Sequence, residues 1–228
     1  MPTKNQKVLK YEELISVKHQ FDFTRWKHVR HVEGGEDIHC RTFDDVVKWF
    51  KAQPVIQKDK SKCPGISRGL TIDRRNKDTM KPPYLVILDF DDVVDPLEKT
   101  SKLFTIMGIR HCGVTTHSHG KAICTAKNCE EGDEVCSECN GSGLKLHRYR
   151  IVTDHIASTW SELRDITEQL FGLLGDPMNK VTTESYDSIF WYLPSVHPDR
   201  QQHYVYRDNV RKLHQGSTWK PKDRKSVV

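Results

Sequence analysis

The stretch from Tyr84 to Asp92, YLVILDFDD, constrains the fold of this chain more than any other. An apolar run with β-branched residues at its centre predicts a buried strand. This run nevertheless ends in three aspartates, which a buried strand should avoid. Because side chains alternate between the two faces of a strand, we expect Asp89 and Asp91 on one face and Asp92 on the other.

The two aspartates on one face predict a metal site. Crowded carboxylates repel each other unless a cation lies between them, and a hard divalent ion such as Mg²⁺ or Mn²⁺ prefers oxygen ligands. Asp89 and Asp91 are therefore candidate metal ligands. The alternative is a strand that has reached the surface, where the acids form a solvated turn or cap the next helix.

The composition is that of a soluble globular protein. The 228 residues are 36% hydrophobic and 29% charged, and no apolar run approaches the length of a membrane span. The polar N-terminus is not a secretory signal. We therefore expect a cytoplasmic protein that makes no use of a membrane. In that compartment its seven cysteines are thiols or metal ligands rather than disulfides.

Positive charge gathers in two segments. The net charge is +5, residues 58–81 hold eight basic residues and three acids, and residues 211–228 hold six basic residues and one acid. A basic tail is usually only a solvated terminus. Two separated basic segments favour a polyanionic partner such as nucleic acid.

Local signals predict alternating strands and helices. Thr42 and Thr159 are candidate helix N-caps, and Pro96 suits a first helical turn. The expected helices span 42–50, 96–107 and 159–174, and the expected further strands span 69–72, 112–116, 147–152, 189–193 and 203–206. The order strand, helix, strand, insertion, strand, helix, strand predicts an α/β or α+β sheet. We expect one domain over 1–210, with an insertion at 121–146, and a basic C-terminal tail at 211–228.

Four cysteines lie close together in the insertion, in the spacing C-x4-C-x6-C-x2-C: Cys124, Cys129, Cys136 and Cys139. Four thiolates can close a tetrahedral Zn²⁺ site, and the last pair has the short spacing of a zinc knuckle. The segment lacks an apolar core, so a metal would have to order it. With four protein ligands such a zinc is structural; unligated surface thiols are the alternative. The other cysteines show no such spacing and are expected to be ordinary core or surface thiols: Cys40, Cys63 and Cys112.

Groups that suit an anion follow the second strand. His117, Ser118 and His119 lie where this strand meets a glycine loop, and together with Lys121 they form a candidate anion-binding edge. The next strand carries two arginines at alternate positions, which could face one phosphate group: Arg148 and Arg150. The alternatives are surface histidines and arginines on an exposed strand face.

In order and spacing, these segments resemble the motifs of the archaeo-eukaryotic primase superfamily, particularly the primase-polymerases of plasmids and phages. The first motif is the strand that ends Leu88-Asp89-Phe90-Asp91, and the second is Thr115-Thr116-His117-Ser118-His119, with the basic strand 148–152 after it. The third is an acid before a Val-Thr pair and a Leu-Pro-Ser element: Asp176, Val181-Thr182 and Leu193-Pro194-Ser195. Taken alone, Gly175-Asp176-Pro177 predicts only a turn.

The resemblance implies a palm-like sheet related to RNA-recognition domains and an enzyme that uses two divalent metal ions. It implies that Asp176 joins Asp89 and Asp91 as a metal ligand. It also implies that the histidine of the second motif contacts the phosphates of the incoming nucleotide. His119 fits that position best because it completes a Ser-His pair with Ser118, with His117 as the other candidate.

The sequence therefore predicts a DNA primase or polymerase that uses nucleoside triphosphates and single-stranded DNA in the cytoplasm of a bacterial or archaeal cell or host. No helicase P-loop of the form G-x-x-x-x-G-K-[ST] is present. We expect any replicative helicase partner on another chain or on a part of the protein outside this sequence. Two rival interpretations are a haloacid dehalogenase-like phosphatase, from the Asp89 strand and Gly175-Asp176, and a non-catalytic zinc module that binds nucleic acid.

Overall fold

The computed structural model describes residues 21–52, 54–121, 124, 143–144, 146–174, 184–209 and 221. These residues form a mixed α/β fold in which neighbouring strands are mostly antiparallel. The expectation of an α/β or α+β sheet is confirmed at this level.

The larger sheet has four strands in the order β12-β8-β9-β7, and each neighbouring pair is antiparallel. Its strands are β7 (Tyr84–Val93), β8 (His111–Thr115), β9 (His147–Ala157) and β12 (Tyr206–Asn209). Helix α3 (Leu97–Ile106) joins β7 to β8, and α4 (Trp160–Leu174) follows β9. Strand β9 thus lies between two strands that a helix connects, which is a split β-α-β arrangement.

A second sheet, in the order β10-β4-β1-β2, is formed mostly by the N-terminal part of the described chain. Its strands are β1 (Phe21–Trp26), β2 (Glu36–Cys40), β4 (Gly65–Ile66) and β10 (Trp191–Tyr192), and α2 (Phe43–Lys51) follows β2. Two short strand pairs are β3 (Val55–Ile56) with β11 (Ser195–Val196), and β5 (Leu70–Thr71) with β6 (Met80–Lys81). The short helices are η1 (Lys60–Lys62), α5 (Glu184–Asp187) and η3 (Pro198–His203).

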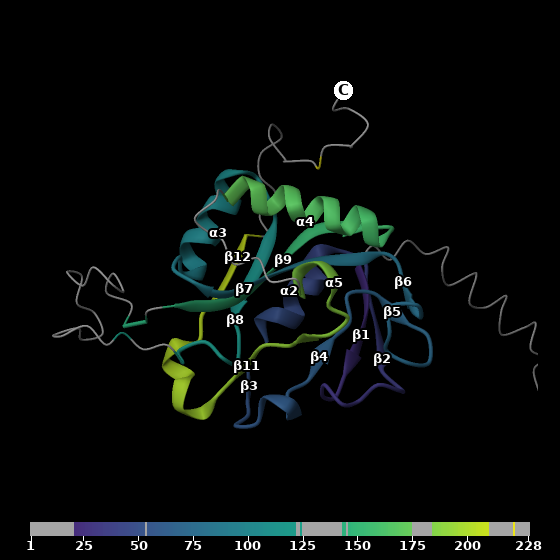
Figure 1. Cartoon of the computed structure of the whole chain (residues 1–228), viewed down its shortest axis with the longest axis horizontal. Helices are drawn as coiled ribbons and strands as arrows, with labels where there is room; N and C mark the ends of the chain where they lie inside the picture. Colours follow the sequence, from purple (N-terminus) through teal and green to yellow (C-terminus); the bar gives the residue numbers. More distant parts are fainter. Residues whose placement is uncertain are drawn as a thin grey trace, which may run out of the picture.

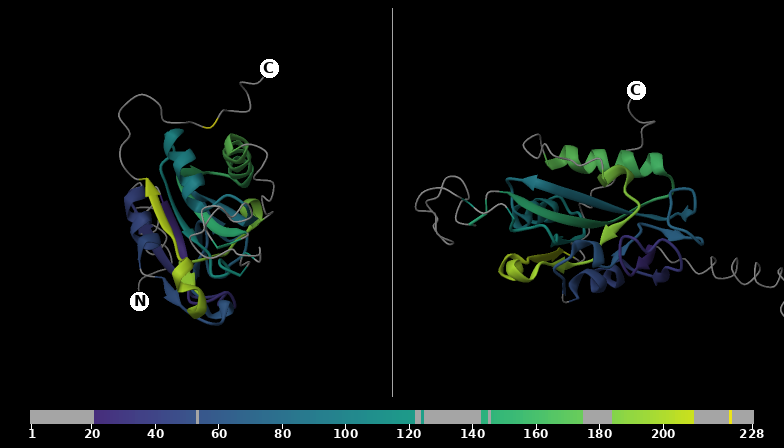
Figure 2. Two further views of the ribbon diagram at one scale, coloured as in Figure 1. Left: turned by 90° about the vertical axis from the view of Figure 1, so that its left-hand side faces the viewer. Right: turned by 60° about the horizontal axis from the view of Figure 1, so that its bottom comes forward.

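The elements stack in three layers, with the larger sheet in the middle (Figures 1 and 2). Helices α3 and α4 cover one face of this sheet, and α2 with the second sheet covers the other. Strand β7 contributes to both cores: Val86, Leu88 and Phe90 pack with α3 and α4, while Leu85 and Ile87 pack toward α2. The alternation along β7 therefore decides which face its terminal acids occupy.

The strand around residues 84–92 and the three long helices agree with the sequence predictions because their signals are local. The Thr42 side chain accepts a hydrogen bond from the backbone N–H of Asp45 in a capping box at the start of α2. At the start of α4, Thr159 Oγ1 accepts from the N–H of Glu162 at 3.1 Å. Gly108, with a φ of 74°, follows the end of α3.

Several expected strands need correction. The strand expected at 203–206 begins only at Tyr206, because His203 is the last residue of η3, which starts at Pro198. The strand expected at 189–193 is limited to β10 and belongs to the second sheet, so β12 completes the larger one. The strand expected at 69–72 is limited to β5, and the β1-β2 hairpin was not predicted.

Candidate active site

The acids at the end of β7 lie on the face of the larger sheet that is turned away from α3 and α4. Asp89 continues the alternation of Leu85 and Ile87, and its side chain is 0% exposed. The β7-β9 register places Arg150 directly opposite, and Arg150 Nε lies 2.8 Å from Asp89 Oδ1. A buried carboxylate is tolerated when a cation pairs with it, and Arg150 supplies that cation.

Asp91 lies near the same pair. Burial raises the pKa of the Asp91 carboxyl, and the negative charge of Asp89 raises it further, while Arg150, Arg148 and Lys60 act in the opposite direction. The two acids therefore repel each other electrostatically on one face of the sheet. Carboxylate oxygens are the ligands that Mg²⁺ and Mn²⁺ prefer.

A β-bulge corrects the expected place of Asp92. Phe90 and Val93 both belong to the core on the helix side of the sheet, so Asp91 and Asp92 between them lie on the same face as Asp89, and not on opposite faces. The register shifts between Phe90 and Val93, so two aspartates of β7 stand opposite Arg148 of β9. Asp92 has a φ of 58°, a left-handed conformation that aspartate adopts more readily than most residues. Arg148 Nε and Nη2 donate to its two carboxylate oxygens at 2.7 and 2.8 Å. The bulge thus gives the neighbouring acids, Asp91 and Asp92, different surroundings.

The two arginines of β9 are paired with different aspartates of β7, and both also act on the Asp91 carboxyl. Arg148 is paired with Asp92, and Arg150 is paired with Asp89. The Arg150 guanidinium also lies 5.3 Å from the ring centre of Trp191 and 6.0 Å from that of Tyr192. Arg150 is thus the arginine that connects the acids to the aromatic side chains of β10.

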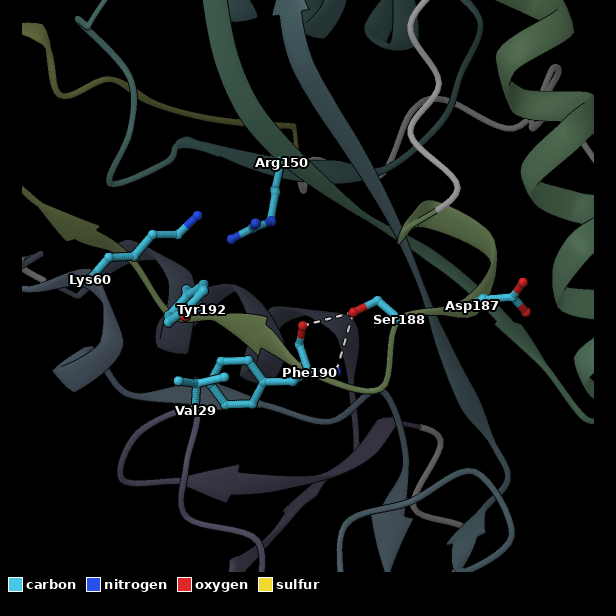
Figure 3. Close-up of a pocket in the computed structure, with 7 residues that line it drawn as sticks. All are labelled: Val29, Lys60, Arg150, Asp187, Ser188, Phe190 and Tyr192. Carbon is cyan, nitrogen blue, oxygen red and sulfur yellow. Dashed lines mark hydrogen bonds between the residues drawn. The ribbon is translucent and has the colours of Figure 1, made fainter.

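A pocket of about 580 Å³ opens beside Arg150 (Figure 3). Its lining residues are Val29, Lys60, Arg150, Asp187, Ser188, Phe190 and Tyr192. The cationic ends of Arg150 and Lys60 point toward the same space next to Tyr192, whereas the carboxylate of Asp187 points away. Asp187 is instead held by Lys77 at 2.6 Å and by Arg164 at 3.6 Å. The charge that lines the pocket is therefore mainly positive.

The histidine loop after β8 is buried. His117, Ser118 and His119 are all at most 6% exposed, and Gly120 turns the chain with a φ of 80°. His119 Nδ1 accepts a hydrogen bond from the backbone N–H of Arg148 at 3.1 Å, and its ring stacks on His147. With Nδ1 accepting, a neutral His119 carries its proton on Nε2.

The other predicted anion ligands lie in different surroundings. His117 Nε2 lies 2.6 Å from the backbone oxygen of Gln57, which ties the histidine loop to the segment that carries Lys60. Lys121 is exposed at the end of the loop. Of the five residues predicted to hold the nucleotide, only Arg150 lines the pocket of Figure 3.

Burial of His119 makes the stability of the fold depend on pH. Burial first, and then the nearby positive groups, lower its pKa to about 3. An unfolded histidine binds a proton near pH 6.5, so below that pH the unfolded state binds more protons than the folded one. Through this group alone, the free energy of unfolding should fall by roughly 1.4 kcal/mol per pH unit between those two values.

Urea unfolding at pH 7 and pH 5 measures this effect. His119→Gln, which keeps an acceptor for Arg148, should lose less stability between the two pH values than the unmodified protein. The exposed His39→Gln variant is the control and should behave like the unmodified protein. An equal loss in all three proteins would contradict the assignment.

Several predicted ligands lie outside the described residues: Asp176, Cys129, Cys136 and Cys139. The fourth cysteine, Cys124, is buried, and its N–H donates to the backbone oxygen of Gly143 at 3.0 Å, so the two ends of the insertion meet. Cys40, Cys63 and Cys112 are buried thiols, as expected. In the part of the chain that is described, no group of three or more His, Cys, Asp or Glu side chains could hold a metal ion.

Comparison with known proteins gives no relative: no protein-family model, no curated protein and no solved structure matches the chain. Over the described ranges, no helix is long and apolar enough to cross a membrane.

Sequence reasoning missed most of the pocket. Lys60 lay within the basic segment 58–81, with nothing to distinguish it from its neighbours. Phe190 and Tyr192 lay in the expected strand at 189–193, and their place at the pocket depends on the pairing of β10 with β4. Val29 carried no signal.

Proposed function

We propose that the protein is a template-directed nucleotidyltransferase that makes primers or extends DNA strands in plasmid or phage replication. The observation that carries the proposal is the acid pair of Asp89 and Asp91 beside a pocket lined by Arg150 and Lys60. Nucleotidyl transfer needs carboxylates that hold divalent ions next to cations that hold a triphosphate. Both requirements are supported on one face of the larger sheet.

The acids fit Mg²⁺ or Mn²⁺. They offer only oxygen ligands, and the pKa of Asp91 is raised first by burial and then by the charge of Asp89, a repulsion that a bound cation would relieve. In this proposal Asp89 and Asp91 hold the ions together with Asp176. When bound, two such ions activate the attacking 3′-hydroxyl and stabilise the negative charge that develops on the α-phosphate.

The side chains around the acids would position the nucleotide. Arg150 and Lys60 would bind the triphosphate, with Ser118 and Lys121 as further contacts of the histidine loop. His119, neutral and with its proton on Nε2, could donate a hydrogen bond to a phosphate oxygen without adding a buried charge. Arg148 would hold the bulge through Asp92 and so fix where Asp91 points.

The topology supports a palm-like sheet in part. The split β-α-β arrangement of β7, α3, β8 and β9 is the one found in ferredoxin-like and RNA-recognition sheets. Strand β12 departs from that order, because it pairs with β8 rather than with β7. The acids would then lie on the sheet face opposite to the helices.

The rivals account for fewer observations. A haloacid dehalogenase-like phosphatase expects a further acid after Gly175-Asp176, where this chain has Lys180, and it leaves the aromatic side of the pocket unexplained. A non-catalytic zinc module that binds nucleic acid does not explain why Asp89 and Asp91 lie together on one face. We therefore retain nucleotidyl transfer, with single-stranded DNA as template, a helicase on another chain and a cytoplasmic location as parts of the proposal.

We also propose that Cys124, Cys129, Cys136 and Cys139 hold one structural zinc ion. The buried position of Cys124 and the contact between the ends of the insertion support a closed loop. The purified protein should contain about one zinc per chain by elemental analysis, and Cys136→Ser with Cys139→Ser should release it. Replacing Cys40 with serine should leave the zinc content unchanged. Reduced, carefully prepared protein without zinc would refute this part of the proposal.

The proposed activity is tested by incubating the purified protein with single-stranded DNA, labelled nucleoside triphosphates and Mg²⁺ or Mn²⁺. Labelled oligonucleotides that form only in the presence of the divalent ion are the expected result. Release of inorganic phosphate from phosphate monoesters, without any oligonucleotide, would favour the phosphatase instead.

A further inference from the structure

We infer that the pocket of Figure 3 is the subsite for a nucleotide, with Tyr192 and Phe190 receiving the base and Lys60 receiving the phosphates. This inference rests on the proposed function, because it assigns the substrate of that reaction to one place. It adds two residues to the site, Phe190 and Tyr192, and gives them the base.

The size and lining of the pocket match such a ligand. About 580 Å³ lies within the range of pockets that hold small molecules and cofactors. In Figure 3 Phe190 and Val29 line the side opposite to Arg150, and Tyr192 lies between them and Lys60. The pocket therefore has an apolar, aromatic side and a cationic side, as a nucleotide has an aromatic base and charged phosphates.

The aromatic side presents ring surfaces in two orientations. The rings of Phe190 and Tyr192 are 4.9 Å apart and nearly perpendicular, at 89°, so one ring offers a face where the other offers an edge. Bases stack on aromatic side chains whatever their sequence, because every base has a π-face. Such a subsite suits an enzyme whose choice of nucleotide comes from the template and not from the pocket.

The cationic side connects the pocket to the acids. The Lys60 ammonium lies 5.1 Å from the ring centre of Tyr192, and Arg150 lies 6.0 Å from it. Arg150 Nε also lies 2.8 Å from Asp89 Oδ1, so the cationic side of the pocket adjoins the acid pair. Phosphates between these cations would be next to the acids, where the reaction is proposed to occur.

Equilibrium binding without catalysis tests the inference. We would measure ATP and inorganic tripolyphosphate by calorimetry in Ca²⁺ buffer, in the absence of template. Tyr192→Leu should weaken ATP binding roughly 5- to 150-fold and leave tripolyphosphate binding unchanged, because only ATP has a base to stack. Tyr192→Phe should restore ATP binding. Lys60→Ala should weaken both ligands about ten- to a hundredfold.

Lys58→Ala is the matched control for Lys60, since Lys58 is an exposed lysine of the same segment outside the pocket lining. Equal loss of both ligands in Tyr192→Leu, or loss of neither, would overturn the assignment of the base. Equal effects of the two lysine variants would overturn the assignment of the phosphates. If binding follows the expected pattern but the protein makes no oligonucleotide, the nucleotide subsite stands and only the proposed polymerisation is rejected.

Discussion

Replacing Arg150 with alanine will destabilise the folded protein by about 3–5 kcal/mol. Asp89 is fully buried, and Arg150 is the cation paired with it at 2.8 Å. Without Arg150, a carboxylate would remain in the core without the charge that offsets its desolvation. Urea unfolding followed by circular dichroism measures the loss.

Arg148→Ala is the matched control for this prediction. Arg148 is also a β9 arginine with an aspartate partner, but its side chain is 28% exposed and that of Asp92 is 32% exposed. Solvent screens such a pair, so its removal should cost only about 0–1 kcal/mol. Mn²⁺ should also stabilise Arg150→Ala more than the unmodified protein, because the ion would replace the missing cation beside Asp89. Equal stability of the two arginine variants would contradict the role given to Arg150.

Replacing Asp91 with asparagine will abolish nucleotide incorporation while making the fold more stable at neutral pH. The pKa of Asp91 is higher in the folded protein than in the unfolded chain, where it is about 3.9. Between those two pKa values the folded state binds more protons than the unfolded state, so the free energy of unfolding falls as pH rises. Asparagine removes this cost together with one proposed metal ligand. A gain in stability with a loss of activity is the expected signature of an acid kept for function.

Asp92→Asn supplies the comparison for Asp91→Asn. It changes the next residue along β7 in the same way, at a left-handed position that asparagine also tolerates. Because asparagine keeps an oxygen that can accept a hydrogen bond from Arg148, this variant should keep the bulge, bind Mn²⁺ and retain most activity. Nucleotide incorporation and Mn²⁺ binding should be measured for both variants. Equal losses in Asp91→Asn and Asp92→Asn would contradict the account.

The sequence predicted those parts of the fold whose signals lie within a few residues. The apolar run of β7, the caps at Thr42 and Thr159 and the alternation that brings Asp89 and Asp91 to one face are of this kind. The pairing of Asp89 with Arg150 was not predictable, because it depends on the register of strands separated by α3, β8 and the insertion.

The bulge and the pocket escaped prediction for the same reason. Without the bulge, Asp91 alone would stand opposite Arg148, whereas the register shift brings Asp92 to Arg148 as well. Lys60 and Tyr192 meet only because η1 and β10 lie side by side in the folded chain. Neither contact has a sequence pattern that would reveal it.

The most direct test of the central claim is nucleotide incorporation on templates of one base. With Mn²⁺, the protein should incorporate labelled adenine nucleotide on oligo(dT) and labelled guanine nucleotide on oligo(dC), and Asp91→Asn should do neither. Such a result would establish that the acid pair serves template-directed transfer. Folded preparations that incorporate nothing, or that incorporate the same nucleotide whatever the template, would contradict it.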